Sequence, residues 1–132
     1  MSESFVGLSA TINQTVTDSM LANSVGSGSV SVFATPELIL LLEKTAVAAL
    51  DGKLDSGQTT VGSALDVTHL AATPAGMNVS GFARVTEVDG RKLTFEVSAK
   101  DDSDEIAEGT HTRFIVEAEK FQKRANSKLN NS

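Results

Sequence analysis

Hydrophobic and polar residues alternate over most of the chain, which is the pattern of strands with one buried face. The alternation is clear over residues 8–17, 59–72, 77–85, 93–99 and 109–121. Pro74-Ala75-Gly76 and Asp89-Gly90 supply turn residues between three of these segments, and a polar break at 101–104 precedes the last one. The pattern predicts an opening strand and, later, an antiparallel meander.

One segment between the strands has the composition of a helix. Thr35 suits the N-cap and Pro36 suits the first helical position, where its missing N–H costs nothing. From there to about Leu50 the residues are apolar almost all round, and Asp51-Gly52 ends the segment. We therefore expect a helix that is wrapped by the rest of the domain instead of lying on its surface.

The order of these segments predicts an α+β fold in which a curved antiparallel sheet wraps around one long central helix. Residues 22–29 are small and flexible, so we expect a loop or mobile cover there, followed by a short extended segment at 30–33. We expect one domain over residues 1–132, with flexible ends at 1–7 and 124–132. Because a single sheet exposes edge strands, two chains are expected to pair along an edge.

The composition of the chain excludes several classes of function. The 132 residues include no cysteine and two histidines, so thiolate nucleophiles and thiolate metal sites are excluded, and no metal is expected. The net charge of -6 argues against nucleic acid as a partner, because polyphosphate binding needs a basic surface. Residues 1–4 lack the basic start of a signal peptide, and no apolar run is long enough to span a bilayer. We expect a cytoplasmic protein without a membrane partner.

Glu43 stands out in the predicted helix because the residues around it are almost all apolar. A buried carboxylate without a partner is costly, so a buried Glu43 would need one. The alternative is that its side chain reaches solvent beside Lys44, as the side chains of most glutamates do.

His69 lies on an apolar strand face, which we expect it to share with Val61, Leu65 and Val67. A neutral imidazole there could accept a proton at physiological pH. The alternative is a core histidine with satisfied hydrogen bonds, because only a partner in space would distinguish the two.

Thr35 is a helix cap when taken by itself, yet its hydroxyl stands at the positive end of the helix dipole, where developing negative charge is favoured. A hydroxyl, an imidazole and a carboxylate form the set that activates a nucleophile or a water molecule. Thr35, His69 and Glu43 therefore form a candidate catalytic group, although spacing alone does not bring them together.

Three segments of the chain, and the spacing between them, carry a family resemblance. The first is VGSGSVSVFATP at residues 25–36, followed by Glu43. The second consists of GQTTVG at 57–62 and VTHLAATPAG at 67–76, and the third is GTHTRF at 109–114. Glu43 follows Thr35 by eight residues, and His69 follows Glu43 by twenty-six and Gly62 by seven. Together these features resemble the fluoroacetyl-CoA thioesterase family of hot-dog fold enzymes.

The resemblance implies a hot-dog fold, a homodimer, and an acyl-CoA substrate bound near the subunit interface. It implies hydrolysis of a small acyl-CoA thioester to free acid and CoA, with no cofactor beyond the CoA of the substrate. By position, Thr35 would be the nucleophile or the water-positioning hydroxyl, His69 the general base and later the acid, and Glu43 the carboxylate that orients the site.

The resemblance also assigns two residues to substrate binding. Gly62 would let the backbone approach the thioester carbonyl. Arg113 would lie near the substrate, and the alternative is an exposed arginine paired with Glu117 or Glu119. We expect His111 to lie on the surface.

One difference from the family bears on specificity, and two other functions remain open. The fluoroacetyl specialist carries aromatic lid residues before its helix, whereas residues 26–29 are glycine and serine here, so a different or broader acyl group is expected. A non-catalytic acyl-CoA-binding module and an acyl-CoA hydratase or dehydratase are the alternatives. Threonine together with glutamate and histidine favours hydrolysis.

Overall fold

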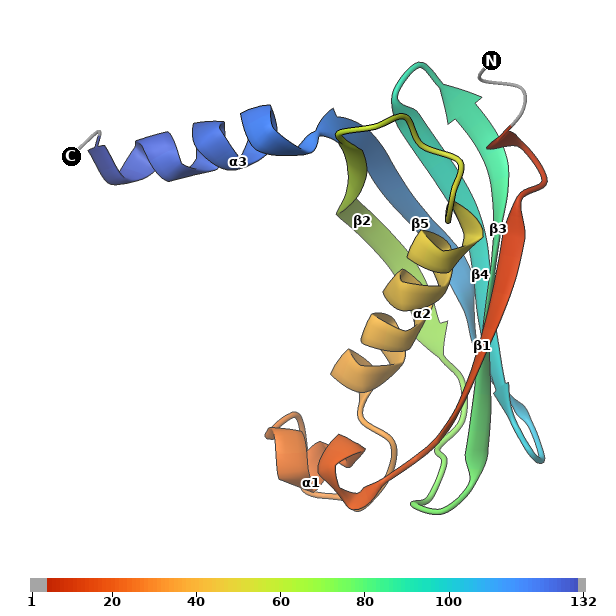
Figure 1. The fold of residues 1–132 in the computed structure, drawn as a ribbon. Coiled ribbons are helices and arrows are strands. Elements are labelled where there is room, and N and C mark those ends of the chain that lie inside the picture. Colours follow the sequence, from red (N-terminus) through yellow and green to blue (C-terminus); the bar gives the residue numbers. More distant parts are fainter. Residues whose placement is uncertain (1–4, 131–132) are drawn as a thin grey trace.

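A curved antiparallel sheet packs around one long helix in the computed structural model, which describes residues 5–130 (Figure 1). Within that range the elements follow in the order β1 Ser9–Thr15, α1 Ala22–Val25, α2 Thr35–Ala49, β2 Gln58–His69, β3 Asn78–Asp89, β4 Lys92–Asp101, β5 Glu105–Glu117 and α3 Ala118–Asn126. The five strands lie in the order β1-β3-β4-β5-β2. The α+β prediction and the curved sheet around a central helix are therefore confirmed.

Hairpins join β3 to β4 and β4 to β5, as the alternating pattern predicts. β2 pairs antiparallel with β5. β1 and β2 form the two edges of the sheet. The register of β2 shifts between Gly62 and Ala64, where a bulge inserts one residue. Because of this shift, Val61 lies on the opposite face from Leu65, so the single face expected for this strand is wrong at Val61.

Helix α2 begins with Thr35 as its first helical residue, and Ala34 occupies the N-cap without a side-chain cap. The predicted threonine cap is therefore wrong, and Pro36 occupies the second helical position instead of the predicted first one, still within the first turn. The Thr35 hydroxyl is free of a capping role and is used elsewhere.

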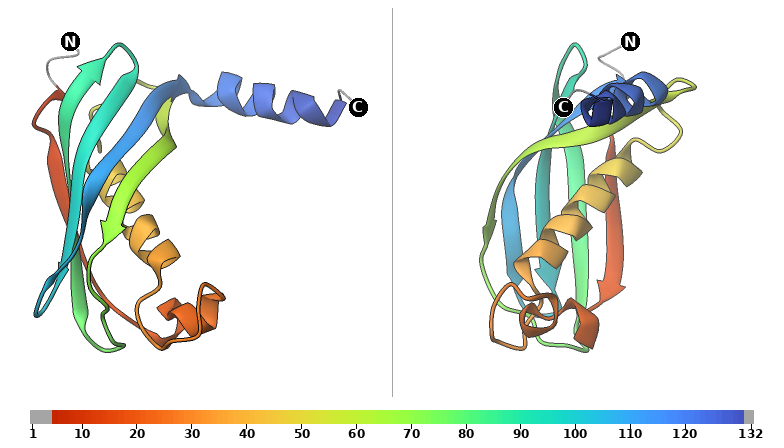
Figure 2. Two further views of the ribbon diagram at one scale, coloured as in Figure 1. Left: turned by 180° about the vertical axis from the view of Figure 1, so that it is seen from behind. Right: turned by 90° about the vertical axis from the view of Figure 1, so that its left-hand side faces the viewer.

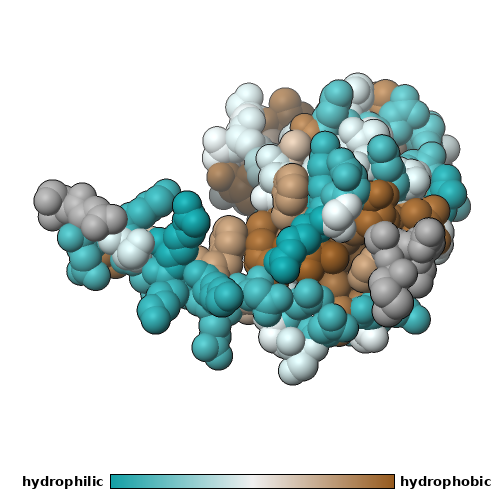
Figure 3. Space-filling view, turned by 90° about the horizontal axis from the view of Figure 1, so that it is seen from above, coloured by the Kyte–Doolittle hydropathy of each residue, from teal (hydrophilic) through white to brown (hydrophobic). Residues whose placement is uncertain are grey.

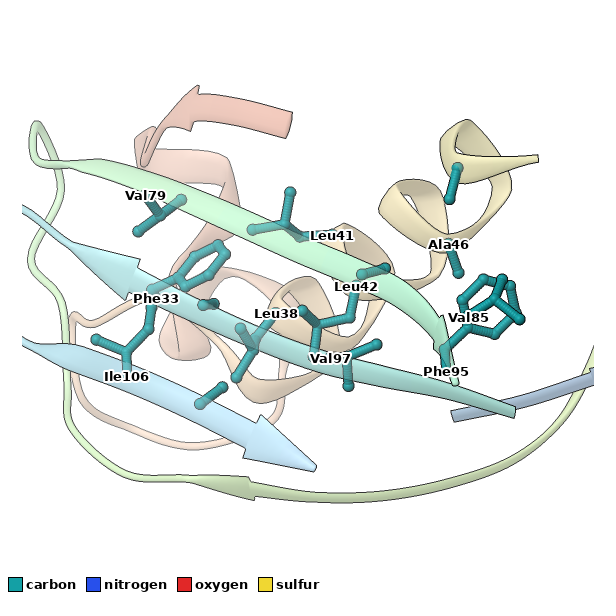
Figure 4. Packing of buried hydrophobic residues seen from close by; sticks show 14 of the residues in the cluster. Phe33, Leu38, Leu41, Leu42, Ala46, Val79, Val85, Phe95, Val97 and Ile106 are labelled. Carbon is teal, nitrogen blue, oxygen red and sulfur yellow. The ribbon is translucent and has the colours of Figure 1, made fainter. Parts of the chain in front are cut away.

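The hydrophobic core lies between one face of α2 and the concave face of the sheet (Figure 4). Leu38, Leu41 and Leu42 of α2 are 0–1% exposed and pack against strand residues such as Val85 and Phe95. Each fully buried side chain of this size contributes about 1.5–3 kcal/mol.

The opposite face of α2 is open to solvent. Leu40 is 42% exposed and Val47 is 51% exposed. Sheet and loops thus leave one stripe of the helix uncovered, and the expectation that the domain wraps it on all sides is not met within one chain.

Two other segments differ from their predicted form. Residues 22–25 form the short helix α1, and residues 30–33 contain only the single bridge between Leu21 and Phe33 in place of an extended strand. The last strand ends at Glu117, and the chain turns into α3, which projects from the body (Figure 2). Residues 127–130 continue as a 3-10 helix, so the described part of the tail is helical; residues 1–4 and 131–132 of the predicted flexible ends lie outside the described range.

Close contact between the backbones of β2 and β5 depends on Gly109. A Cβ atom at this position would collide with the carbonyl oxygen of Asp66 and the Cα of Val67. We expect Gly109→Ala to lower the free energy of unfolding by about 1–3 kcal/mol, the usual cost of overpacking. Urea unfolding measures this, with Thr110→Ala on the exposed neighbouring position as the control. A Gly109→Ala protein as stable as the control would show that β2 and β5 are less tightly apposed.

Candidate functional site

Thr35 and His69 form the first of two polar clusters. The Oγ1 atom of Thr35 lies 2.8 Å from Nδ1 of His69, so the start of α2 is hydrogen-bonded to the end of β2. Two of the three predicted catalytic residues are therefore in direct contact. An open pocket of about 400 Å³ adjoins this pair and is lined also by Phe33 and Leu70.

The surroundings of His69 favour its neutral form. Burial lowers the pKa of His69 below 6.5, and the backbone of Ala71 acts in the opposite direction. Its Nε2 atom is enclosed and forms no regular hydrogen bond within the described residues. Nδ1, which faces the Thr35 hydroxyl, is therefore the ring atom available for proton transfer.

Glu43 and Arg113 form the centre of the second cluster. Arg113 Nη1 donates to Glu43 Oε2 at 3.3 Å, and the Glu43 side chain remains 37% exposed. Thr35 and Glu43 are eight positions apart on α2, which separates them by roughly 12 Å along the helix axis. Within one chain, Glu43 consequently pairs with Arg113 and not with the Thr35–His69 pair.

Arg113 is buried, at 6% exposure, and each of its three guanidinium nitrogens donates a hydrogen bond. Nε donates to Oγ1 of Thr60 at 2.9 Å and Nη2 donates to the carbonyl of Thr60 at 3.1 Å. Burial lowers the pKa of Arg113, and the charge of Glu43 opposes that effect. The alternative of an exposed arginine paired with Glu117 or Glu119 is therefore wrong.

His111 belongs to the same cluster and is fully buried, so its expected surface position is wrong. Its Nδ1 lies 2.8 Å from the carbonyl oxygen of Ala64, and its Nε2 lies 3.2 Å from Arg113 Nη1. Since a carbonyl only accepts and a guanidinium only donates, His111 is neutral with its proton on Nδ1. Burial is the main cause that lowers its pKa, and the charge of Arg113 adds to it.

Alternation along β5 is the signal by which His111 could have been found. Phe114 is 37% exposed on one side of β5, and the helix-facing side carries His111, Arg113 and Ile115. A polar residue on that side is easily taken for a solvent-facing one, as His111 was.

Gly62 makes room for the second cluster. A Cβ atom at this position would lie 2.6 Å from Glu43 Oε2 and 3.2 Å from Arg113 Nη1. Gly62 is paired with Arg113 across the β2–β5 ladder, so both predicted substrate-binding residues lie beside Glu43. The glycine thus allows a carboxylate to approach the backbone of β2.

Two features are absent from residues 5–130, a metal-binding cluster and a membrane-spanning helix. No three histidine or acidic side chains gather in a way that could hold a metal ion. No helix in this range has the length and apolarity of a membrane span.

Known proteins similar to this chain are thioesterases and hot-dog fold proteins. The fluoroacetyl-CoA-specific thioesterase family matches residues 16–119. The fluoroacetyl-CoA thioesterase of Streptantibioticus cattleyicolor is 42% identical over 97 residues, which are 74% of this chain and 70% of that protein. A phenylalanine-to-alanine variant of the fluoroacetyl-CoA-specific thioesterase, solved with fluoroacetate and CoA, is 36% identical with a TM-score of 0.83, covering 88% of this chain and 98% of the other.

A more distant neighbour supports the fold alone. The hot-dog-like protein from Thermanaerovibrio acidaminovorans is 24% identical with a TM-score of 0.84, covering 93% of this chain and 91% of the other. The hot-dog fold is therefore shared with proteins of low sequence identity.

Both histidines make the stability of the protein depend on pH. Their folded pKa values lie below the ordinary 6.5, so the unfolded chain binds protons first as the pH falls. Stability is therefore full above about pH 6.5 and is lost as the pH falls toward the folded values. We expect urea unfolding between about pH 7.5 and about pH 5.5 to show this loss, with a smaller slope in His111→Gln. An identical slope in that variant would contradict the buried neutral histidine.

Proposed function

The chain belongs to the family of fluoroacetyl-CoA-specific thioesterases and is a hydrolase of acyl-CoA thioesters, and we propose that Thr35 and His69 carry out the reaction together with Glu43 of a partner chain. The observation that carries this proposal is the 2.8 Å contact between the Thr35 hydroxyl and Nδ1 of His69. A hydroxyl hydrogen-bonded to a neutral imidazole is the arrangement that activates an oxygen nucleophile.

The proton path follows from that contact. Nδ1 of His69 takes a proton from the Thr35 hydroxyl, or from a water molecule that this hydroxyl positions, as the oxygen attacks the thioester carbonyl. The C–S bond then breaks, and the protonated imidazole returns the proton to the sulfur of the departing CoA. If water is the nucleophile, the free acid is released at this step. If Thr35 is the nucleophile, Nδ1 next takes a proton from a water molecule that attacks the acyl-threonine ester, and the C–O bond to Thr35 breaks to release the acid and restore the hydroxyl. The lowered pKa of His69 suits this role, because the ring must be neutral before the attack.

Glu43 completes the site from a second chain in this proposal. Gly62 and His69 lie on the edge strand β2, seven residues apart. If two β2 strands pair antiparallel about a point midway between them, Gly62 of each chain comes opposite His69 of its partner. Glu43 packs directly against Gly62, so its carboxylate would then adjoin the partner's Thr35–His69 pair.

Exposed apolar side chains beside this edge support a homodimer. Leu65 on β2 is 38% exposed, and the open stripe of α2 with Leu40 and Val47 flanks Glu43 at helical spacing. Burial of such residues in a second chain removes apolar surface from water and also protects the strand edge.

Arg113 and His111 are positioning residues in this scheme. Arg113 holds Glu43 through Nη1, while His111 accepts from the same Nη1 and is itself fixed to Ala64 at the β2 bulge. This chain of contacts fixes the position of the Glu43 carboxylate relative to the bulge of β2.

We propose a small acyl group, broader in range than fluoroacetyl. Residues 26–29 are glycine and serine, and Ser27 lines the Thr35–His69 pocket beside Phe33. Small side chains at this part of the cover discriminate weakly between acyl groups of similar size.

The role of His69 is tested by His69→Ala, which removes the general base. We expect kcat for acetyl-CoA hydrolysis to fall by roughly 10²-fold or more, with a much smaller change in KM. Thr35→Ser keeps the hydroxyl and should retain partial activity, whereas Thr35→Ala should resemble the histidine variant. Because the Thr35 side chain does not cap α2, both threonine variants should melt near the parent temperature. Parent-like turnover by His69→Ala would overturn the assignment.

A further inference from the structure

Helix α3 is a basic arm on an acidic protein. Lys120, Lys123 and Arg124 are exposed on it, and Arg91 is exposed on the hairpin between β3 and β4. The space-filling view from above shows hydrophilic side chains along this arm (Figure 3). Within residues 5–130, neither Lys120 nor Arg124 forms an ion pair. Their charges are therefore available to an anion.

An apolar groove lies at the foot of this arm. It encloses about 600 Å³, and Val61, Phe114 and Phe121 contribute its apolar lining. Lys120 and Arg124 line the same groove together with Arg91, and Glu117 is its one acidic neighbour. Phe114 is 37% exposed and Phe121 is 46% exposed, so both rings can contact a ligand.

The two kinds of lining correspond to the two parts of a nucleotide. Exposed aromatic rings stack on a base, and lysine and arginine bind phosphate oxygens. Acidic side chains are concentrated elsewhere, since the β4–β5 turn carries Asp101, Asp102 and Asp104. The charge distribution therefore favours a polyanion at the groove and disfavours one at the acidic β4–β5 turn.

We propose that the groove between α3 and β5 binds the phosphorylated adenosine diphosphate of acyl-CoA. The inference rests on the proposed function, because an acyl-CoA substrate supplies both the base and the phosphates. Phe114 and Phe121 contact the adenine, while Arg91, Lys120 and Arg124 bind the 3′-phosphate and the diphosphate.

The groove is close to the proposed catalytic cluster. Val61 precedes Gly62 and Phe114 follows Arg113, so the groove and the Glu43 cluster occupy opposite faces of the same two strands. In this proposal the long pantetheine arm of CoA passes from one face to the other round the start of β2. There the N–H of Ala118 donates to Gly57, and α3 begins.

Calorimetric titration with free CoA tests the site without relying on turnover. We expect Lys120→Glu and Arg124→Glu each to raise the Kd for CoA by about 10- to 100-fold, the scale of one lost charge-assisted hydrogen bond. Lys53→Glu is the matched control, because it makes the same charge change at an exposed position that does not line the groove. An unchanged Kd in both groove variants, or an equal rise in the control, would overturn the proposal.

Kinetics with a truncated substrate separates nucleotide binding from chemistry. Arg124→Glu should lower kcat/KM for acetyl-CoA but leave it unchanged for S-acetyl-N-acetylcysteamine, which has the thioester and no nucleotide. Equal losses with both substrates, or loss of the dimer in light scattering, would assign α3 a structural role and overturn the proposal. If CoA binding weakens as expected while the parent hydrolyses no thioester, the groove stands and the proposed function fails.

Discussion

The packing of α2 against the concave face of the sheet is the constraint on which the site depends. The buried leucines of α2 hold this helix against the sheet. The same helix carries Thr35 at its start and Glu43 two turns later. A rigid helix cannot bring these two residues together, because roughly 12 Å of axial rise separates them. The proposed catalytic set is therefore divided into two clusters within each chain, and pairing of two chains is the route that we propose for joining them.

The Glu43 cluster shows why a buried cation is tolerated at this point. Arg113 loses its hydration on burial, and an isolated buried charge would cost several kcal/mol. Its donors are instead satisfied by Thr60, His111 and Glu43. Glu43 itself remains partly exposed, so the pair presents a held carboxylate to the open face of α2. Such a network costs stability relative to an apolar core, and it is understandable only if the position of the carboxylate matters.

Alternation and helix signals in the sequence predicted the sheet, the central helix and the fold class, because burial of one face dictates those patterns. They could not reveal the bulge beside Ser63, which moves Val61 to the other face, since a one-residue insertion leaves no compositional mark. His111 was missed because polar residues on a buried strand face look like solvent-facing ones until their partners are known. The Thr35–His69 contact joins residues thirty-four positions apart, so family resemblance, and not spacing, pointed to it.

The central claim is that Glu43 of one chain serves Thr35 and His69 of the other, and subunit complementation tests it most directly. Thr35→Ala and Glu43→Gln proteins, each nearly inactive alone, are mixed, unfolded and refolded together. Half of the resulting dimers are mixed, and each mixed dimer has one site with all residues intact, so about a quarter of the parent activity should return. Activity no higher than the mean of the two separate variants would show that each site is built within one chain, and would contradict the account.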